Sequence, residues 1–142
     1  MPQDESFELL HKDITDKILR AFYDVYNKLG YGFLERVYEN ALAIELRKIG
    51  LRIEQQKLLN VYYDGCLVGE YYADIVVEEK VILELKAIET ITQALTAQLQ
   101  NYLKATKIEV GMLLNFGRKA DFKRKVFSNA RKAFKAETQE TL

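Results

Sequence analysis

The first fifty residues carry apolar side chains at helical spacing. Within Phe7–Leu29 the apolar positions step by three or four residues, which is the period of an α-helix, and Gly30 is suited to end it. A second helix is expected over about Phe33–Ile49, before Gly50. The intervening "LGYGFLE" is then a corner between two helices. It is not a dinucleotide loop, because no strand precedes its G-x-G and the third glycine is missing.

After Gly50 the pattern changes to that of β-strands. Three β-rich runs cover residues 51–63, 66–77 and 81–87. Asp64-Gly65 between the first two runs is a strong hairpin signal, and Glu78–Lys80 is a short turn between the second and the third. The pattern predicts an antiparallel meander.

The last third predicts a helix, a strand and a second helix. Thr90 and Gln93 resemble a capping box for a helix over about Thr92–Lys104, and residues 108–117 read as a buried strand. A basic helix is expected next, with its apolar positions at Phe122, Val126, Ala130 and Phe134. We therefore predict one α/β (α+β) domain over residues 1–142, a mixed sheet flanked by helices, with a disordered polar tail from about residue 136.

Charged residues interrupt two of the predicted strands. "VILELKAIE", residues 81–89, is apolar enough for a core but contains Glu84 and Lys86, which lie on one face of a strand. If Glu78–Lys80 form the turn, Val77 pairs with Val81 and Asp74 comes to lie opposite Glu84. Two acids and a lysine are thereby predicted to share one face of the sheet.

Two facing carboxylates destabilise a hairpin, and burial increases the cost. A divalent cation reverses that sign, because Mg²⁺ takes oxygen ligands and is commonly held by one or two carboxylates together with water and substrate phosphates. The alternative is an ion-pair cluster on a partly covered face. A change of one residue in the turn would also move Asp74 to the opposite face.

Composition fits one soluble globular domain. The chain has 142 residues, 49% of them hydrophobic and 30% charged, with a formal net charge of zero. Its N-terminal stretch is polar and acidic, unlike a secretory signal, and no run is apolar enough to span a membrane, so we expect a cytoplasmic protein. The lone Cys66 excludes an intrachain disulfide, and with only His11 beside it no zinc set exists. Any metal must be bound by oxygen.

Charge is unevenly distributed along the chain. Residues 104–135 carry ten Lys and Arg against two acids, a net +8, and the remainder carries eleven against nineteen, a net −8. A basic surface suited to phosphate backbones beside an acidic, cation-binding region is one interpretation, and a solvated basic helix is the other. Under the first, the residues expected to bind nucleic acid are Arg118, Lys119, Lys123, Arg124 and Lys125.

Asp74 followed by Glu84-Leu85-Lys86 resembles the D…(D/E)-x-K signature of the PD-(D/E)XK nuclease superfamily, with Ala73 in place of the proline. Three further features are similar to RecB-type nucleases and phage exonucleases: an upstream helical acid and a Q-x-x-x-Y after the signature strand, namely Glu35, Gln98 and Tyr102. The segment "GFLERVY", residues 32–38, resembles the bacterial GxxExxY proteins. The resemblance covers residues 7–127.

The resemblance implies a restriction-endonuclease-like fold and a Mg²⁺- or Mn²⁺-dependent phosphodiesterase acting on nucleic acid, with DNA the expected substrate. It implies that Asp74 and Glu84 bind the metal, helped by the Leu85 carbonyl and by Glu35. Lys86 would orient the attacking water or stabilise the transition state. Gln98 and Tyr102, four residues apart on one helical face, would position metal ligands, the lysine or the DNA strand. The implied products carry a 5′-phosphate and a 3′-hydroxyl.

Two other readings stay open. One is a non-catalytic nucleic-acid-binding or protein-assembly module on a nuclease-like fold, and the other is an α+β protein whose acids are merely ion-paired. The tyrosine-rich segment of residues 58–72 offers a ribbon that could pair with a second copy to make a homodimer, or could be ordinary sheet.

Overall fold

The computed structural model describes residues 9–132, which form five strands, three α-helices and one short 3₁₀ helix. In chain order these are α2 (Lys12–Leu29), α3 (Glu35–Lys48), β1 (Ile53–Tyr63), β2 (Cys66–Val77), β3 (Val81–Lys86), α4 (Gln93–Lys104), β4 (Val110–Phe116), β5 (Ala120–Val126) and η1 (Asn129–Arg131).

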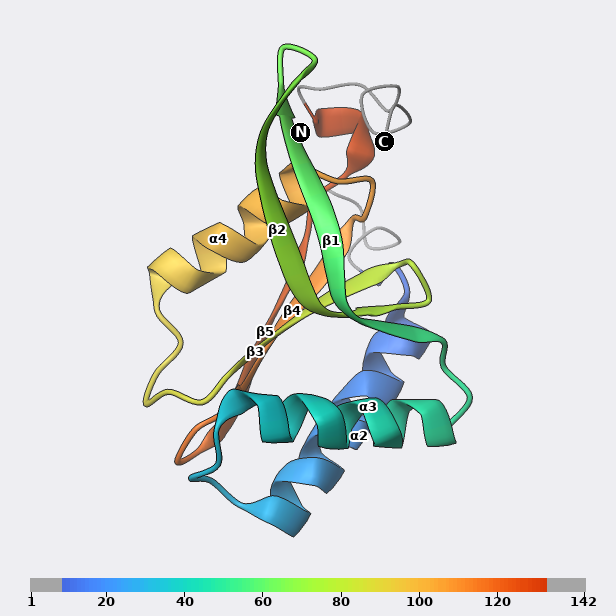
Figure 1. Ribbon diagram of the computed structural model, residues 1–142. Coiled ribbons are helices and arrows are strands. Elements are labelled where there is room, and N and C mark those ends of the chain that lie inside the picture. The colour runs from blue at the N-terminus through green and yellow to red at the C-terminus, as the bar shows by residue number, and fades with distance from the viewer. Residues whose placement is uncertain (1–8, 133–142) are drawn as a thin grey trace.

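The strands form one sheet in the order β1-β2-β3-β4-β5. All neighbouring strands are antiparallel except β3 and β4, which are parallel and are joined by α4 as the crossover. Helices α2 and α3 lie together on one side of the sheet, and α4 lies on the other (Figure 1). This arrangement confirms the predicted mixed sheet with an antiparallel meander and flanking helices, consistent with a restriction-endonuclease-like fold.

The two faces of the sheet bury two hydrophobic clusters. The larger one lies under α2 and α3, where Tyr38 is fully buried and stacks on Phe116 with ring centroids 4.4 Å apart. Phe22 packs its ring edge against Phe116 at 4.8 Å. The smaller cluster lies under α4, and Leu99 and Leu103 supply that helix's buried face. β3, in the middle of the sheet, is covered on both sides, which explains its nearly continuous apolar sequence.

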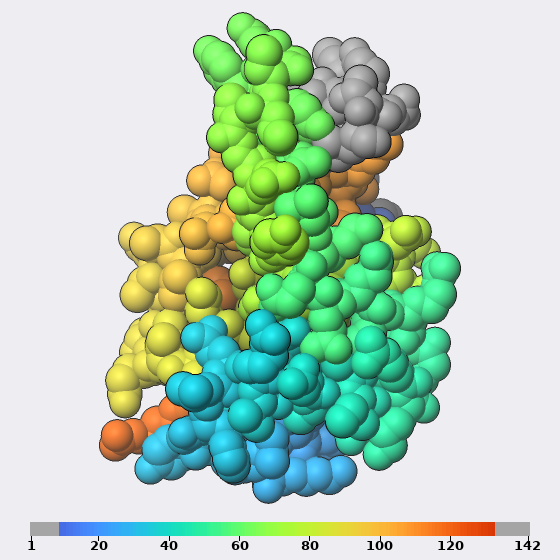
Figure 2. Space-filling view, in the orientation of Figure 1, coloured from blue at the N-terminus to red at the C-terminus, as the bar shows by residue number. Residues whose placement is uncertain are grey.

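The hairpin of β1 and β2 continues beyond the rest of the sheet as a twisted ribbon, seen at the top of Figure 1 and as the green projection in Figure 2. Its tip is the predicted Asp64-Gly65 turn, with φ of 51° and 76°. Tyr63 and Tyr72 are 71% and 57% exposed on it. Pairing with a second copy stays a prediction.

The predicted basic helix is wrong, because residues 120–126 form strand β5, which pairs antiparallel with β4. The apolar spacing of four residues between Phe122 and Val126 fits a period of two as well as a period of 3.6, so it could not decide between strand and helix. Pairing decides it, since β5 satisfies the hydrogen-bonding edge of the buried strand β4. Phe134 and the predicted disordered tail lie outside the described residues.

Two predicted helix starts differ from the structure. Thr92, rather than Thr90, is the N-cap of α4, and its hydroxyl accepts a hydrogen bond from the Leu95 N–H at 3.2 Å. Helix α2 begins at Lys12, after His11 with φ of 58°, whereas the predicted start at Phe7 lies outside the described residues. Within residues 9–132, no helix is both long and apolar enough to cross a membrane.

Candidate active site

The candidate site begins where β2 and β3 separate. The predicted pairs Val77–Val81, Val76–Ile82 and Ile75–Leu83 all form. The expected next pair, Asp74 with Glu84, is not part of the ladder. Instead, each acid hydrogen-bonds to the backbone of the other's strand. The two acids still lie together, but through side-chain contacts that the register alone did not specify.

Asp74 is half-buried and accepts hydrogen bonds at both carboxylate oxygens. Oδ2 accepts from the Leu85 N–H at 2.8 Å, and Oδ1 accepts from Nε2 of Gln56 on β1 at 3.4 Å. Gln56 has φ of 52°, so the chain of β1 leaves ordinary strand geometry beside Asp74. Burial, followed by the charge of Glu39, raises the pKa of Asp74 despite the hydrogen bonds from Leu85 and Gln56.

Glu84 is the more perturbed of the two acids. Its Oε2 accepts a 2.7 Å hydrogen bond from the Tyr71 hydroxyl and a 3.3 Å bond from the Asp74 N–H. Burial and the nearby Asp74 charge raise the pKa of Glu84 to about 7, although these hydrogen bonds and Lys86 act in the opposite direction. The carboxylates of Asp74 and Glu84 are therefore partly desolvated and close together, and the positive charge around them is too small to offset their repulsion.

Lys86 is the last residue of β3 and is half-buried, two residues beyond Glu84 on the same face. Its positive charge acts to lower the pKa of both Asp74 and Glu84, but less strongly than burial acts to raise it. The intervening Leu85 points to the opposite face and is only 1% exposed. The alternation of β3 thus divides its residues between the core and the site.

Tyr102 reaches the site through another tyrosine. Its ring stacks on Tyr71, with centroids 3.3 Å apart and planes 14° apart. Burial and the charges of Glu84 and Asp74 raise the pKa of Tyr102, so its hydroxyl stays protonated. Gln98 lies one turn earlier on α4 and is exposed. The Q-x-x-x-Y helix therefore borders the acids, with the tyrosine in contact with Tyr71.

Helix α3 supplies a buried acid that the sequence pattern alone did not indicate. Glu39 is 4% exposed, and its two oxygens accept 2.8 Å hydrogen bonds from Nε2 of Gln55 and Nε2 of Gln56. Glu35, the acid that was singled out, lies one turn earlier at the start of α3 and is exposed. The paired glutamines of β1 were the one sequence signal for Glu39, because two adjacent amides can satisfy both oxygens of a buried carboxylate.

The chemistry of these donors fits a hard divalent cation. Asp74 and Glu84 offer carboxylate oxygens, and two carboxylates with water and a substrate phosphate suffice for Mg²⁺ or Mn²⁺. A bound cation would also supply the positive charge that the raised pKa values of both acids show to be lacking. Within the described part of the chain, no group of three or more His, Cys, Asp or Glu is placed to hold a metal. Water and a substrate phosphate would complete the coordination of a cation held by Asp74 and Glu84.

The basic residues expected to bind nucleic acid fall into three places. Arg118 and Lys119 occupy the turn between β4 and β5. Lys123 and Lys125 line an open groove of 400 Å³ beside the first turns of α4. Arg124 is directed to the opposite side, where its guanidinium donates to the Leu10 carbonyl at 2.6 Å. The strand alternation that replaced the predicted helix separates Arg124 from its lysine neighbours.

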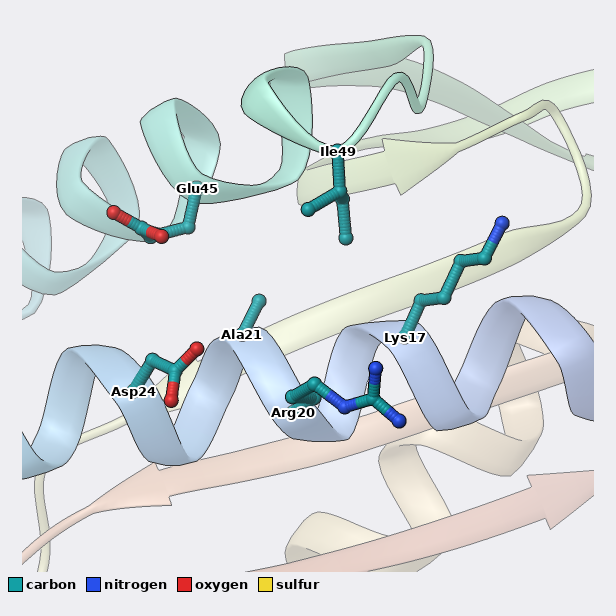
Figure 3. A pocket seen from close by; sticks show the side chains of 6 residues that line it. All are labelled: Lys17, Arg20, Ala21, Asp24, Glu45 and Ile49. Atoms are coloured by element: carbon teal, nitrogen blue, oxygen red, sulfur yellow. The ribbon is translucent and has the colours of Figure 1, made fainter.

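A smaller hollow of 130 Å³ lies between α2 and α3 (Figure 3). It is lined by two basic and two acidic side chains with Ala21 and Ile49, the charged ones being Lys17, Arg20, Asp24 and Glu45. None of its residues belongs to β2 or β3. Its mixed charges and small volume give it no connection to the chemistry of Asp74 and Glu84.

Comparison with known proteins agrees with this geometry. The sequence model described as the PD-(D/E)XK nuclease superfamily matches residues 12–126. No curated protein is significantly similar to the chain. A solved structure titled "Crystal structure of SSO0001" superposes with a TM-score of 0.53 at 16% sequence identity, over 66% of this chain and 50% of that one. The present chain thus spans about half of that protein, and the likeness concerns the fold alone.

Proposed function

Since the chain belongs to the PD-(D/E)XK nuclease superfamily, we propose that it is a metal-dependent nuclease that hydrolyses phosphodiester bonds, with DNA as its substrate. One observation carries the proposal. Asp74 and Glu84, from neighbouring strands, are both half-buried with raised pKa values, and Lys86 lies two residues beyond Glu84 on the same face of β3. An arrangement that costs stability in the absence of a cation is expected at a functional site.

Asp74, Glu84 and the Leu85 carbonyl are the proposed ligands of Mg²⁺ or Mn²⁺. When bound, the cation supplies a Lewis acid for the phosphoryl oxygen and lowers the pKa of a coordinated water. Lys86 would hold the attacking water in line or neutralise charge that develops on the phosphate. Glu35 would act from α3, either directly or through water. Glu35 is exposed at the start of the helix, so its carboxylate can rotate in solvent.

Tyr71, Tyr102 and Gln98 would act on the acids and the strand rather than on the reacting bond. The Tyr71 hydroxyl fixes one Glu84 oxygen, and Tyr102 fixes the Tyr71 ring by stacking. Gln98 is exposed one turn away, so its amide is available to a nucleic-acid strand passing over α4. These residues are positioning residues under this proposal.

The phosphate backbone is proposed to follow the basic residues on the α4 side of β5. Lys123 and Lys125 line the groove beside α4 with Thr92 and Thr96, so cationic and hydroxyl donors lie together there. Arg118 and Lys119 extend the positive charge to the β4–β5 turn. Arg124 is a weaker candidate for contact with nucleic acid, because its guanidinium is held by the Leu10 carbonyl.

Within the superfamily we propose kinship with the GxxExxY proteins and the RecB-like branch. The motif of residues 32–38 has a structural rationale that supports the first. Gly32 has φ of 113°, which side-chain-bearing residues rarely adopt, and the Tyr38 hydroxyl donates to the Gly30 carbonyl at 2.6 Å. The glycine and the tyrosine of the motif thereby build the corner that leads to Glu35.

The rival function is a nucleic-acid-binding or assembly module that has lost catalysis. Its homodimeric form would use the exposed tyrosines of the β1–β2 ribbon. Retention of Asp74, Glu84 and Lys86 together favours the enzyme, since the loss of any one would be the simplest route to inactivity.

A cleavage panel tests the proposal. Single-stranded, duplex and branched DNA and an RNA strand are incubated with the parent chain in Mg²⁺, in Mn²⁺ and in EDTA, beside Lys86→Ala. We expect cleavage of DNA that requires the metal and is abolished by Lys86→Ala, with 5′-phosphate ends. Equal cleavage by parent and variant would indicate contamination, and nucleic-acid binding without any cleavage would favour the binding module.

A further inference from the structure

Three connecting segments meet at one end of the sheet and border an open hollow of 490 Å³. They are the α2–α3 corner, the segment after β3 and the β4–β5 turn, whose ribbons converge at the lower left of Figure 1. In Figure 2 the orange β4–β5 turn projects beside the blue corner at the same place. This volume is within the roughly 300–1,000 Å³ of small-molecule sites.

The hollow lies at the carboxyl ends of the two parallel strands. β3 ends at Lys86 and β4 at Phe116, and the next residues along the chain, Ala87 and Gly117, both line the hollow. In open sheets with parallel strands, ligands bind outside these carboxyl ends. The hollow therefore begins one residue away from the lysine of the candidate active site.

Its outer wall is made of exposed aromatic rings. Tyr31 is 59% exposed and Phe33 is 47% exposed, so neither ring serves mainly as core packing. The Arg118 guanidinium lies 5.7 Å from the Tyr31 ring centroid. Exposed rings beside an arginine form a stacking platform for nucleobases, because every base has a flat π-face and every nucleotide has a phosphate.

The corner that carries the rings is held in place by buried Tyr38. The Tyr38 hydroxyl donates to the Gly30 carbonyl at 2.6 Å and accepts from the Phe33 N–H at 3.3 Å, which fixes the corner from both sides. The Phe33 ring packs edge-on against the Tyr38 ring at 6.0 Å. A stacking surface that is already ordered loses little entropy when a base binds.

The floor of the hollow is equally fixed. The Asn115 side chain, 1% exposed, accepts from the Ile88 N–H at 3.0 Å and donates to the Ile88 carbonyl at 2.9 Å. Gly117 passes so close that an added Cβ would lie 1.9 Å from the Ile88 carbonyl oxygen. The Tyr26 hydroxyl is within 2.8 Å of the Gly117 carbonyl oxygen and 2.7 Å of that of Arg118. The segment after β3 and the β4–β5 turn are therefore held at a fixed distance from each other.

A phosphate could replace Glu89 as the partner of Arg118 at the rim of the hollow. Arg118 is paired with Glu89 at 3.6 Å, but the two side chains are 70% and 77% exposed, so the pair is weak. A phosphate can accept from the same guanidinium in two places at once.

From this geometry we propose that Tyr31, Phe33 and Arg118 form a subsite for an unpaired nucleotide of the substrate strand, next to the cleaved phosphate. The base stacks on the rings and Arg118 contacts its phosphate. Bases in a duplex have their faces covered by their neighbours, so the occupant is single-stranded nucleic acid or a frayed end. The inference rests on the proposed function, because it takes the strand to continue from Lys86.

Binding of two matched strands tests the subsite. A fluorescein-labelled 12-nucleotide oligothymidylate and an abasic strand of the same length, which keeps the phosphates but lacks bases, are titrated with the full chain in EDTA. We expect the parent to bind the thymidylate at least tenfold more tightly than the abasic strand. Tyr31→Ala and Phe33→Ala should each weaken thymidylate binding about five- to thirtyfold and leave abasic binding unchanged. Arg118→Ala should weaken both.

Tyr63→Ala is the matched control, because Tyr63 is exposed at the tip of the β1–β2 ribbon and lies outside the hollow. Phe33→Ala could disturb folding, so Tyr31→Ala, which removes the more exposed ring, serves as a second test. Melting temperatures show whether each variant is folded. Unchanged thymidylate affinity in both variants, or equal affinity of the parent for the two strands, would overturn the subsite even if Mn²⁺-dependent cleavage persists. Absence of both binding and cleavage would overturn the proposed function with it.

Discussion

Asp74 on β2 accepts a 2.8 Å hydrogen bond from the backbone N–H of Leu85 on β3, in place of the ladder pair that the register would continue. The Asp74 carboxylate thus holds the backbone of β3 at Leu85, the residue that follows Glu84. Because Glu84 in turn accepts from the Asp74 N–H, each acid is oriented by the other's strand. The candidate site is therefore formed where β2 and β3 cease to pair. Its two acids are already oriented by the protein without a ligand.

Removal of the Tyr71 hydroxyl is expected to impair metal-dependent cleavage. Tyr71→Phe deletes the 2.7 Å hydrogen bond to Glu84, which favours the charged form of that acid. A hydrogen bond to a charged group contributes about 1.5–3 kcal/mol. We expect the cleavage rate at pH 7 to fall about 10- to 100-fold, with recovery at higher pH or higher Mn²⁺. The control is Tyr72→Phe, the exposed neighbour on the other face, and an equal loss there would refute the role of Tyr71.

Glu39 and Glu35, one turn apart on α3, are expected to behave oppositely. Glu39→Ala leaves the Gln55 and Gln56 amides without their acceptor in a buried place and should lower the free energy of unfolding by about 1–3 kcal/mol. Glu35→Ala, at an exposed position, should change it by less than about 0.5 kcal/mol.

Urea denaturation measures both changes, and the cleavage assay then assigns the helix acid. Loss of cleavage in Glu35→Ala at unchanged stability would support Glu35 as the acid that reaches the metal site. Full activity in Glu35→Ala would exclude it. A stability loss in Glu35→Ala as large as that in Glu39→Ala would contradict the burial difference.

The sequence predicted the register of the β2–β3 hairpin better than it predicted the end of the fold. The hairpin register followed from one turn, Glu78–Lys80, and the alternation around it, so the three pairs up to Ile75–Leu83 were correct. Beyond them, the ladder is replaced by side-chain hydrogen bonds at Asp74, and periodicity carries no information about such a replacement. Glu39 escaped notice for a related reason, because its partners Gln55 and Gln56 are close only in the folded chain.

Strand β5 shows a different limit. Phe122 and Val126 are compatible with both periods, and basic residues between them suited a surface helix. What decides is the unpaired edge of β4, a fully buried strand whose backbone needs partners on both sides. This requirement belongs to the assembled sheet and has no local signature in the sequence.

Gly117→Ala is expected to destabilise the chain far more than Gly111→Ala. A Cβ on Gly117 would lie 1.9 Å from the backbone oxygen of Ile88, which cannot move without breaking its bond to Asn115. A Cβ on Gly111 would meet Cδ1 of Leu99 at 2.9 Å, the end of a side chain that can rotate. We expect a loss of about 2–4 kcal/mol at Gly117 and about 1 kcal/mol at Gly111 in urea denaturation. Equal losses would contradict the rigid floor of the hollow.

Lys132 should make stability rise with pH in the alkaline range. Its Nζ donates to the Thr106 and Ile108 carbonyls at 2.6 and 3.0 Å, and burial lowers its pKa from 10.5 to about 8. Between these values the unfolded chain binds more protons than the folded one, so the free energy of unfolding increases from about pH 8 to pH 10.5. Urea denaturation across this range measures the slope. Lys132→Met should reduce it, and an unchanged slope would contradict the shifted pKa.

Calorimetric titration of the full chain with Mn²⁺ tests directly whether Asp74 and Glu84 hold one cation between them. We predict one bound ion per chain, with affinity at least tenfold lower in Asp74→Asn and in Glu84→Gln. Glu54→Gln, which alters an exposed acid of β1, should leave it unchanged. Mn²⁺ binding of equal affinity in the parent and in both site variants, or no binding by the parent, would contradict the claim that Asp74 and Glu84 hold one cation between them.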